Sequence, residues 1–157
     1  MEGAGAMGPS LFFDDLVVGQ SFTTGTEQVT AEEIIAFARR WDPQPFHVDP
    51  VAAEASHFGG LVASGLHTLS QTFRLFEDLR LFRDSVVAGA GMEGVRFLAP
   101  VRAGDVLRVK VTVAEVRPTR RPDRGIVALR FETTNQDGVA VLAAELRAFI
   151  RRRSAGS

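Results

Sequence analysis

The 157-residue chain contains no cysteine. Disulfide bonds and thiolate metal sites are therefore excluded, and a cytoplasmic setting is expected. The sequence also lacks an excess of either charge, because its formal net charge is −1 at pH 7. Such a balance gives no general attraction to nucleic acid or to an anionic membrane. No apolar run approaches the ~20 residues of a membrane span, so we expect neither kind of partner.

The first ten residues, MEGAGAMGPS, lack both the basic and the apolar region of a secretory signal. They are rich in small residues, and residues 1–10 are predicted to be disordered. The tail at residues 154–157 has the same character and the same prediction. Between them, hydrophobic residues are plentiful, at 45% of the whole chain. We therefore expect one folded domain over residues 11–153.

The segment from Ser21 to Thr30 is rich in threonine and predicts a first strand. A helix is predicted to follow, with Thr30 as its N-cap and Glu33 at the capping-box spacing. It should end near Asp42, because Pro43 disfavours α geometry in the residue before it. The apolar face predicted for this helix comprises Ile34, Phe37, Ala38 and Trp41.

A longer helix is predicted from Leu66 to Phe82, where bulky apolar residues recur every three or four positions. We interpret this stripe as core rather than as the lining of a tunnel. After Val86 the apolar residues alternate, which predicts antiparallel strands, and Asp137-Gly138 is a hairpin signal. The expected fold is α+β, with one long helix against a curled antiparallel sheet.

The stretch DPQPFHVDP, from Asp42 to Pro50, combines three prolines with titratable side chains. Proline fixes φ and stiffens the backbone, and imidazoles titrate near neutral pH, where a carboxylate can orient them. Asp42 and His47 are therefore a candidate catalytic pair. An aspartate before proline also commonly begins a turn, so a purely structural role stays open. One histidine and two aspartates are few ligands for a metal ion, so no metal site is expected.

The same stretch resembles the hydratase motif of the MaoC-like dehydratase family, which includes the (R)-specific enoyl-CoA hydratases. That motif runs Asp, any residue, Asn, Pro, any residue, His, any residue, Asp, Pro. Downstream, GGLVASGLHT is similar to the start of the family's central helix, and VRFLAPVRAGD to a strand-turn stretch. The resemblance extends from about Leu16 to Arg151.

The resemblance implies a hotdog fold, in which a curved antiparallel sheet wraps around a long central helix. It implies a lyase of fatty acid metabolism that adds water to a trans-2-enoyl-CoA, or dehydrates a 3-hydroxyacyl-CoA. Asp42 and His47 would activate the water, and the backbone N–H of Gly65 would stabilise the thioester oxygen. A homodimer or dimer of dimers is implied, and no cofactor, since coenzyme A is part of the substrate.

Two departures from the family pattern bear on the substrate. Gln44 stands where the family has asparagine, and Ser64 where it commonly has histidine, although Ser64 can still cap a helix. His67 is either a satisfied helix histidine or a pocket residue, and His57 is interpreted as a surface residue. The arginines of a predicted hairpin loop are either solvated or meet the phosphates of coenzyme A: Arg117, Arg120, Arg121 and Arg124.

Two other functions are compatible with these residues. A hotdog thioesterase also aims a carboxylate at water near a donor at a helix terminus. A non-catalytic module that binds acyl thioesters or dimerises is the second alternative, motivated by Gln44 and Ser64.

Overall fold

The computed structural model of the chain describes residues 8–154. The terminal segments expected to be disordered lie largely outside this range. Ser10 is described and buried, and its hydroxyl donates to the Leu81 carbonyl at 3.3 Å and accepts from the Asp84 N–H at 3.0 Å. The packed part of the chain therefore includes Ser10, one residue before the expected start of the domain.

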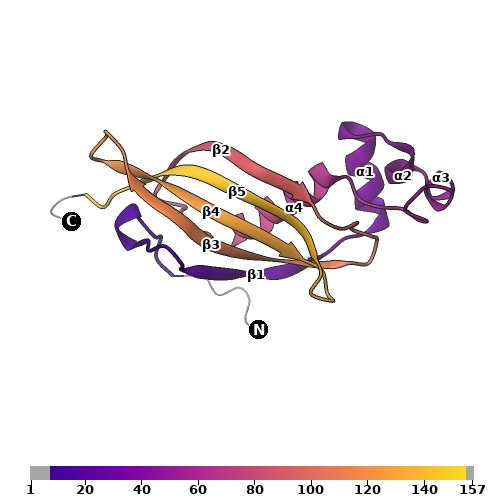
Figure 1. Cartoon of the computed structure of the whole chain (residues 1–157), viewed down its shortest axis with the longest axis horizontal. Helices are drawn as coiled ribbons and strands as arrows, with labels where there is room; N and C mark the ends of the chain where they lie inside the picture. The colour runs from indigo at the N-terminus through magenta and orange to yellow at the C-terminus, as the bar shows by residue number, and fades with distance from the viewer. Residues whose placement is uncertain (1–7, 155–157) are drawn as a thin grey trace.

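Five antiparallel strands form one curved sheet in the order β1-β3-β4-β5-β2 (Figure 1). In β3, buried residues alternate with outward-facing ones, as in Val109, Val111 and Val113, and the buried side chains belong to the core. The predicted hairpin at Asp137-Gly138 joins β4 to β5, with Gly138 at φ +75°. The strands are β1 (Ser21–Gln28), β2 (Val86–Phe97), β3 (Val106–Pro118), β4 (Arg124–Thr134) and β5 (Ala140–Arg151).

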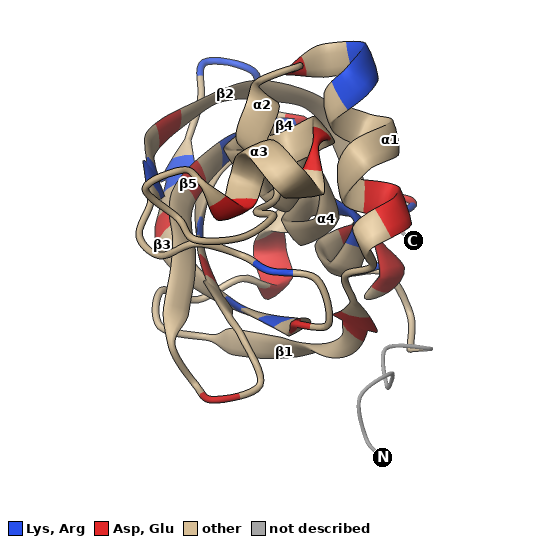
Figure 2. Ribbon diagram, turned by 90° about the vertical axis from the view of Figure 1, so that its right-hand side faces the viewer, with Lys and Arg blue, Asp and Glu red and all other residues tan. Residues whose placement is uncertain are grey.

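Helix α1 (Ala31–Trp41) follows β1 and has the predicted capping box. The Thr30 hydroxyl accepts from the Glu33 N–H at 3.2 Å, and the Glu33 carboxylate accepts from the Thr30 N–H at 3.3 Å. Figure 2 shows acidic residues at the start of α1 and basic residues at its end, an order that complements the helix dipole.

Trp41 does not lie on the buried face of α1, contrary to the prediction. Its side chain is 60% exposed, and the Arg40 guanidinium lies 5.0 Å from the ring centroid. The reason is the position of α1, which lies beyond the end of the sheet, so no strand covers its last turn (Figure 1).

The central helix α4 (Gly65–Asp78) ends four residues before Phe82, so the predicted helix was too long. Arg80 has φ 55° and turns the chain, while Leu79 and Phe82 are buried beyond the helix end. The predicted stripe is also wrong at Leu66, which is 50% exposed. The buried face is instead partly polar and comprises His67, Thr68, Gln71, Thr72, Leu75 and Phe76.

The sheet supplies a partner for one residue of this polar face, Thr72. The Thr72 and Thr133 hydroxyls lie 2.7 Å apart, and this hydrogen bond joins α4 to β4. A buried hydroxyl with a partner costs far less than an orphaned one. The spacing of apolar residues could not predict that this face is buried, because Thr133, the partner of Thr72, is distant in the sequence.

Two short helices follow α1, and both begin within the proline-rich stretch from Asp42 to Pro50. They are α2 (Pro45–Val48) and α3 (Pro50–Glu54), and each begins with a proline. Proline suits the first helical position, where its missing N–H would have no partner. A single 3-10 turn, η1 (Phe13–Asp15), precedes β1. Between residues 8 and 154 no helix is long and apolar enough to span a membrane.

Candidate active site

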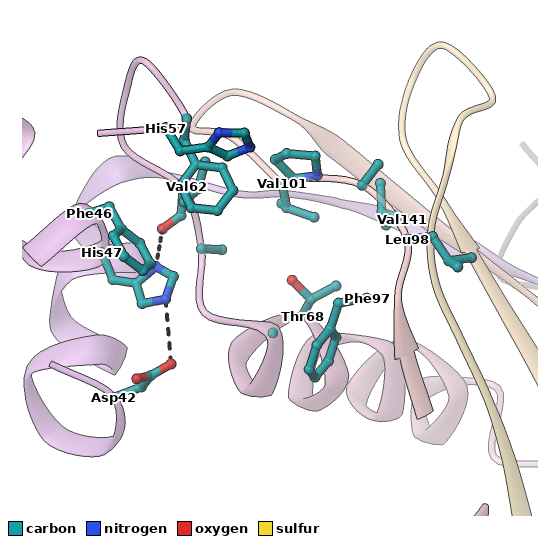
Figure 3. A pocket seen from close by; sticks show the side chains of 15 residues that line it. Asp42, Phe46, His47, His57, Val62, Thr68, Phe97, Leu98, Val101 and Val141 are labelled. Carbon is teal, nitrogen blue, oxygen red and sulfur yellow. Dashed lines mark hydrogen bonds and ion pairs between the residues drawn. The ribbon is translucent and has the colours of Figure 1, made fainter. Parts of the chain in front are cut away.

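Asp42 and His47 come together where α1 gives way to α2. Asp42 is the C-cap of α1, and its N–H donates to the Ala38 carbonyl at 2.8 Å. His47 lies in α2, and its N–H donates to the Gln44 carbonyl at 2.9 Å. The Asp42 Oδ2 and His47 Nε2 atoms are 3.4 Å apart (Figure 3). The two candidate catalytic side chains therefore share one small space.

The backbone of Val62 fixes the orientation of the His47 ring. The Val62 carbonyl lies 2.7 Å from His47 Nδ1 (Figure 3), and the Val62 N–H donates to the Phe46 carbonyl at 3.2 Å. A carbonyl can only accept, so Nδ1 carries the proton. In the neutral ring Nε2 then presents a lone pair beside Asp42.

Ser64 and Gly65 place the start of α4 beside this pair. Ser64 is the predicted N-cap, and its Oγ accepts from the Leu66 N–H at 3.2 Å. The same hydroxyl donates to Asp42 Oδ2 at 2.7 Å. Gly65 is the first residue of α4, and within residues 8–154 its N–H makes no hydrogen bond. A free N–H at the positive end of a helix is a suitable donor to a developing negative charge.

A cavity of about 490 Å³ opens beside these groups. Asp42, His47, Gly65 and Thr68 line its polar side, and most of the remaining wall is apolar (Figure 3). The apolar wall includes Phe46, Phe58, Phe97, Leu98, Val101 and Val141. Such a cavity, apolar with a few convergent polar groups, is typical of a small-molecule site.

The ring of Phe97 covers the first residue of α4. A Cβ atom added at Gly65 would lie 2.6 Å from this ring. Phe97 is nevertheless 58% exposed, because it ends the edge strand β2. Glycine at position 65 therefore makes room for an aromatic wall directly over the candidate donor.

Three of the residues assigned to the site from sequence do not line the cavity: Gln44, Ser64 and His67. Gln44 is exposed. His67 is buried between α4 and α1, where it stacks on Phe37 with ring centroids 4.7 Å apart. Burial lowers the pKa of His67, and the negative charge of Glu33 partly opposes this effect.

His57 is exposed, in keeping with its interpretation as a surface residue, yet it also lines the cavity. Its ring packs edge-on against Phe58, at 5.4 Å between centroids. No sequence pattern places His57 at the cavity, because this position depends on the chain folding back over α2. The Val62 carbonyl was missed for another reason, since a backbone acceptor carries no signature in the sequence.

The arginines of the loop between β3 and β4 lie away from the cavity lining. Arg117 pairs with Glu115, and Arg121 and Arg124 pair with Asp123. Among residues 8–154 no group of three or more His, Asp or Glu could hold a metal ion.

A five-stranded antiparallel sheet curved around one central helix, with a polar cluster at the helix start, defines the class: this is a hotdog fold. The family model described as "MaoC like domain" matches residues 15–135. The chain therefore belongs to the MaoC-like dehydratase family, a family of hydratases and dehydratases.

Individual proteins agree with this assignment. The uncharacterized protein YdeM of Bacillus subtilis is 35% identical over 139 residues, which are 88% of this chain and 98% of YdeM. A 3-hydroxybutyryl-CoA dehydratase of Methylorubrum extorquens is 32% identical over 124 residues, covering 73% of this chain and 71% of that protein. The crystal structure of a MaoC-like dehydratase from Rhodospirillum rubrum superposes with a TM-score of 0.86 at 42% identity, covering 92% and 99% of the two chains.

Proposed function

We propose that the protein is an (R)-specific enoyl-CoA hydratase, which also runs in reverse as a 3-hydroxyacyl-CoA dehydratase. The observation that carries this proposal is the 3.4 Å approach of Asp42 and His47 at the wall of an apolar cavity that Gly65 also lines. The name of the Methylorubrum relative, a 3-hydroxybutyryl-CoA dehydratase, supports the same reaction.

The geometry of the pair suits a water molecule. With the Nδ1 proton donated to the Val62 carbonyl, His47 Nε2 and the Asp42 carboxylate are two neighbouring acceptors. A water can donate one hydrogen to each and present an oxygen lone pair to the substrate. That oxygen attacks Cβ of the enoyl thioester, one water proton passes to the pair, and the pair delivers a proton to Cα.

Gly65 supplies the complementary charge stabilisation. As the C–O bond forms, the π electrons move through Cα onto the thioester oxygen, which becomes an enolate. The N–H of Gly65, at the first turn of α4, is available to donate to this oxygen. Collapse of the enolate onto the delivered proton completes the addition of H and OH, and the reverse sequence expels water.

The acyl chain of the substrate binds against the apolar wall of the cavity. Phe46, Leu98, Val101 and Val141 offer apolar surface beside the polar cluster, while the coenzyme A part of the substrate extends toward solvent. The enzyme needs no other cofactor, because the groups required for addition of water are all side-chain or backbone groups.

The test is hydration of crotonyl-CoA and longer trans-2-enoyl-CoAs, followed as loss of the enoyl thioester absorbance. Asp42→Asn and His47→Asn should each lower kcat/KM by about 10²-fold or more, the usual contribution of general acid–base catalysis. Circular dichroism should show that both variants fold. Undiminished turnover after replacement of both residues would refute this mechanism, and release of free thiol would indicate a thioesterase instead.

We further propose that a second copy of the chain pairs along β2. This strand bonds only to β5 among the described residues, and it is exposed over most of its length. Edge strands with apolar side chains are prone to pair. Exposed apolar residues gather where β2 ends beside the start of α4: Leu66, Val95, Phe97 and Leu98.

Val95 offers a test of this pairing because it does not line the cavity. Val95→Lys should shift the protein from dimer, or dimer of dimers, toward monomer in light scattering coupled to size exclusion. A wild-type protein that is monomeric at high micromolar concentration would contradict the proposal.

A further inference from the structure

We propose that Ser64 is a positioning residue for Asp42, and that its one hydroxyl fixes the catalytic carboxylate relative to the start of α4. This inference rests on the proposed hydratase function and adds to it a residue that acts through Asp42. The sequence predicts that Ser64 caps the helix and bears on the substrate, but it assigns no contact between Ser64 and Asp42.

The direction of each hydrogen bond at Ser64 is unambiguous. A backbone N–H can only donate, so the Leu66 N–H donates to Ser64 Oγ at 3.2 Å. An ionised carboxylate can only accept, so the single Ser64 hydroxyl hydrogen goes to Asp42 Oδ2 at 2.7 Å. The side chain is also fully buried, with 0% exposure, so water does not compete for these bonds.

Asp42 has little else to hold its side chain. It follows the last turn of α1, its side chain is 26% exposed, and Pro43 comes next. Among the described residues, its carboxylate contacts only two polar partners, Ser64 at 2.7 Å and His47 Nε2 at 3.4 Å. The His47 contact is the longer of the two and exceeds the usual length of an N–H···O hydrogen bond. Ser64 is thus the hydrogen-bonded contact that keeps Oδ2 beside the ring.

Because the Ser64 hydroxyl occupies Asp42 Oδ2, the other carboxylate oxygen is the one that binds the water. Oδ1 makes no hydrogen bond to any residue within 8–154 and stays available. With Oδ2 held by Ser64, Oδ1 and His47 Nε2 are the two acceptors for one water molecule. Loss of the Ser64 hydroxyl would let the carboxylate rotate toward solvent and spoil this arrangement.

The same hydroxyl ties the acid–base pair to the oxyanion donor. Ser64 caps the first turn of α4, where the Gly65 N–H lies, and it binds a carboxylate 22 residues away in the sequence. The spacing between the activated water and the thioester oxygen therefore depends on one side chain. Misplacement of reacting groups by about 1 Å can cost about 10²-fold in rate.

The experiment compares Ser64→Ala with Thr30→Ala in the full-length enzyme. Each variant removes the N-cap of one helix and should lower the melting temperature, but only Ser64 contacts Asp42. Ser64→Ala should lower kcat about 10- to 100-fold with KM within about twofold. Thr30→Ala should lose a similar amount of thermal stability and keep its kcat within about twofold.

Two further variants separate positioning from folding. Ser64→Thr keeps the hydroxyl and should restore most of kcat. Ser64→Cys keeps a side chain of similar size with a weak donor, so its kcat should fall even where its melting temperature matches the wild type. If both Ser64→Ala and Ser64→Cys retain wild-type kcat, or if Thr30→Ala loses as much activity, the role of Ser64 is refuted. A wild-type protein that hydrates no enoyl-CoA overturns the proposed function as well, and this outcome is distinct from an active wild type with active variants.

Discussion

The Phe97 ring packs over Gly65, the first residue of α4. Gly65→Ala would place a methyl group 2.6 Å from the present position of the Phe97 ring. Phe97 is exposed enough to swing away, and alanine is the better helix former, so stability should change by less than about 1 kcal/mol. KM for an enoyl-CoA should rise severalfold, because the displaced ring no longer shapes the cavity.

A double-mutant cycle isolates this contact. In a Phe97→Ala background, Gly65→Ala should have little further effect on KM, since the ring it displaces is already gone. Equal effects of Gly65→Ala in both backgrounds would show that the added methyl group acts on the N–H donor rather than on Phe97.

Gln44 is the position where the motif departs from the family pattern, yet the structure keeps its side chain out of the cavity. Its contribution comes through the backbone, where its carbonyl accepts from the His47 N–H. Gln44→Asn and Gln44→Ala should therefore keep kcat/KM within about twofold, as for ordinary surface substitutions. A tenfold change in steady-state kinetics for either variant would place the Gln44 amide in contact with substrate.

At the scale of elements, the bond between Thr72 and Thr133 joins the buried face of α4 to the sheet. Thr72→Val or Thr133→Val alone leaves one buried hydroxyl without its partner and should cost about 1–3 kcal/mol. The double variant replaces both groups with apolar ones of the same shape and should cost less than the sum. Urea denaturation of the four proteins measures this coupling, and strict additivity would argue against the hydrogen bond.

The two main helices differ in how far their sequences predict them. The ends of α1 follow from local chemistry, the Thr30–Glu33 box at one end and Pro43 at the other, and both predictions are confirmed. The face and length of α4 do not follow, because Phe82 is buried beyond the helix and Thr72 is satisfied by a distant strand. Local signals fix helix ends, whereas burial depends on partners that only the tertiary fold supplies.

The residues of the site also differ in how far the sequence predicts them. The motif identifies Asp42 and His47 as neighbours, and the geometry agrees. The groups that orient them, the Val62 carbonyl and the Ser64 hydroxyl, lie 15 and 22 residues away from their partners. Their roles depend on the return of the chain over α2, which no local pattern encodes.

For the whole molecule, His67 should make stability depend on pH. Burial lowers the pKa of His67, so the folded state binds fewer protons than the unfolded state. This contribution is fully present above the unfolded pKa of about 6.5. It is lost progressively as the pH falls below that value, so the free energy of unfolding should decrease from pH 7 to pH 5.

Two variants test the assignment by urea denaturation at several pH values. His67→Phe keeps a ring to stack on Phe37 and should flatten the dependence between pH 7 and pH 5. Glu33→Gln removes the charge that opposes the shift and should steepen it, while glutamine still suits the capping box. An unchanged slope in His67→Phe would assign the effect to other groups.

The exposed side chain of Trp41 has a practical consequence for spectroscopic measurements on this protein. The chain has one tryptophan and no tyrosine, so its near-ultraviolet emission comes almost entirely from a single indole. That indole directly precedes Asp42 and lies under the Arg40 guanidinium at 5.0 Å. Movement at the end of α1 when an acyl-CoA enters would therefore register as a change in intrinsic fluorescence, without any attached dye.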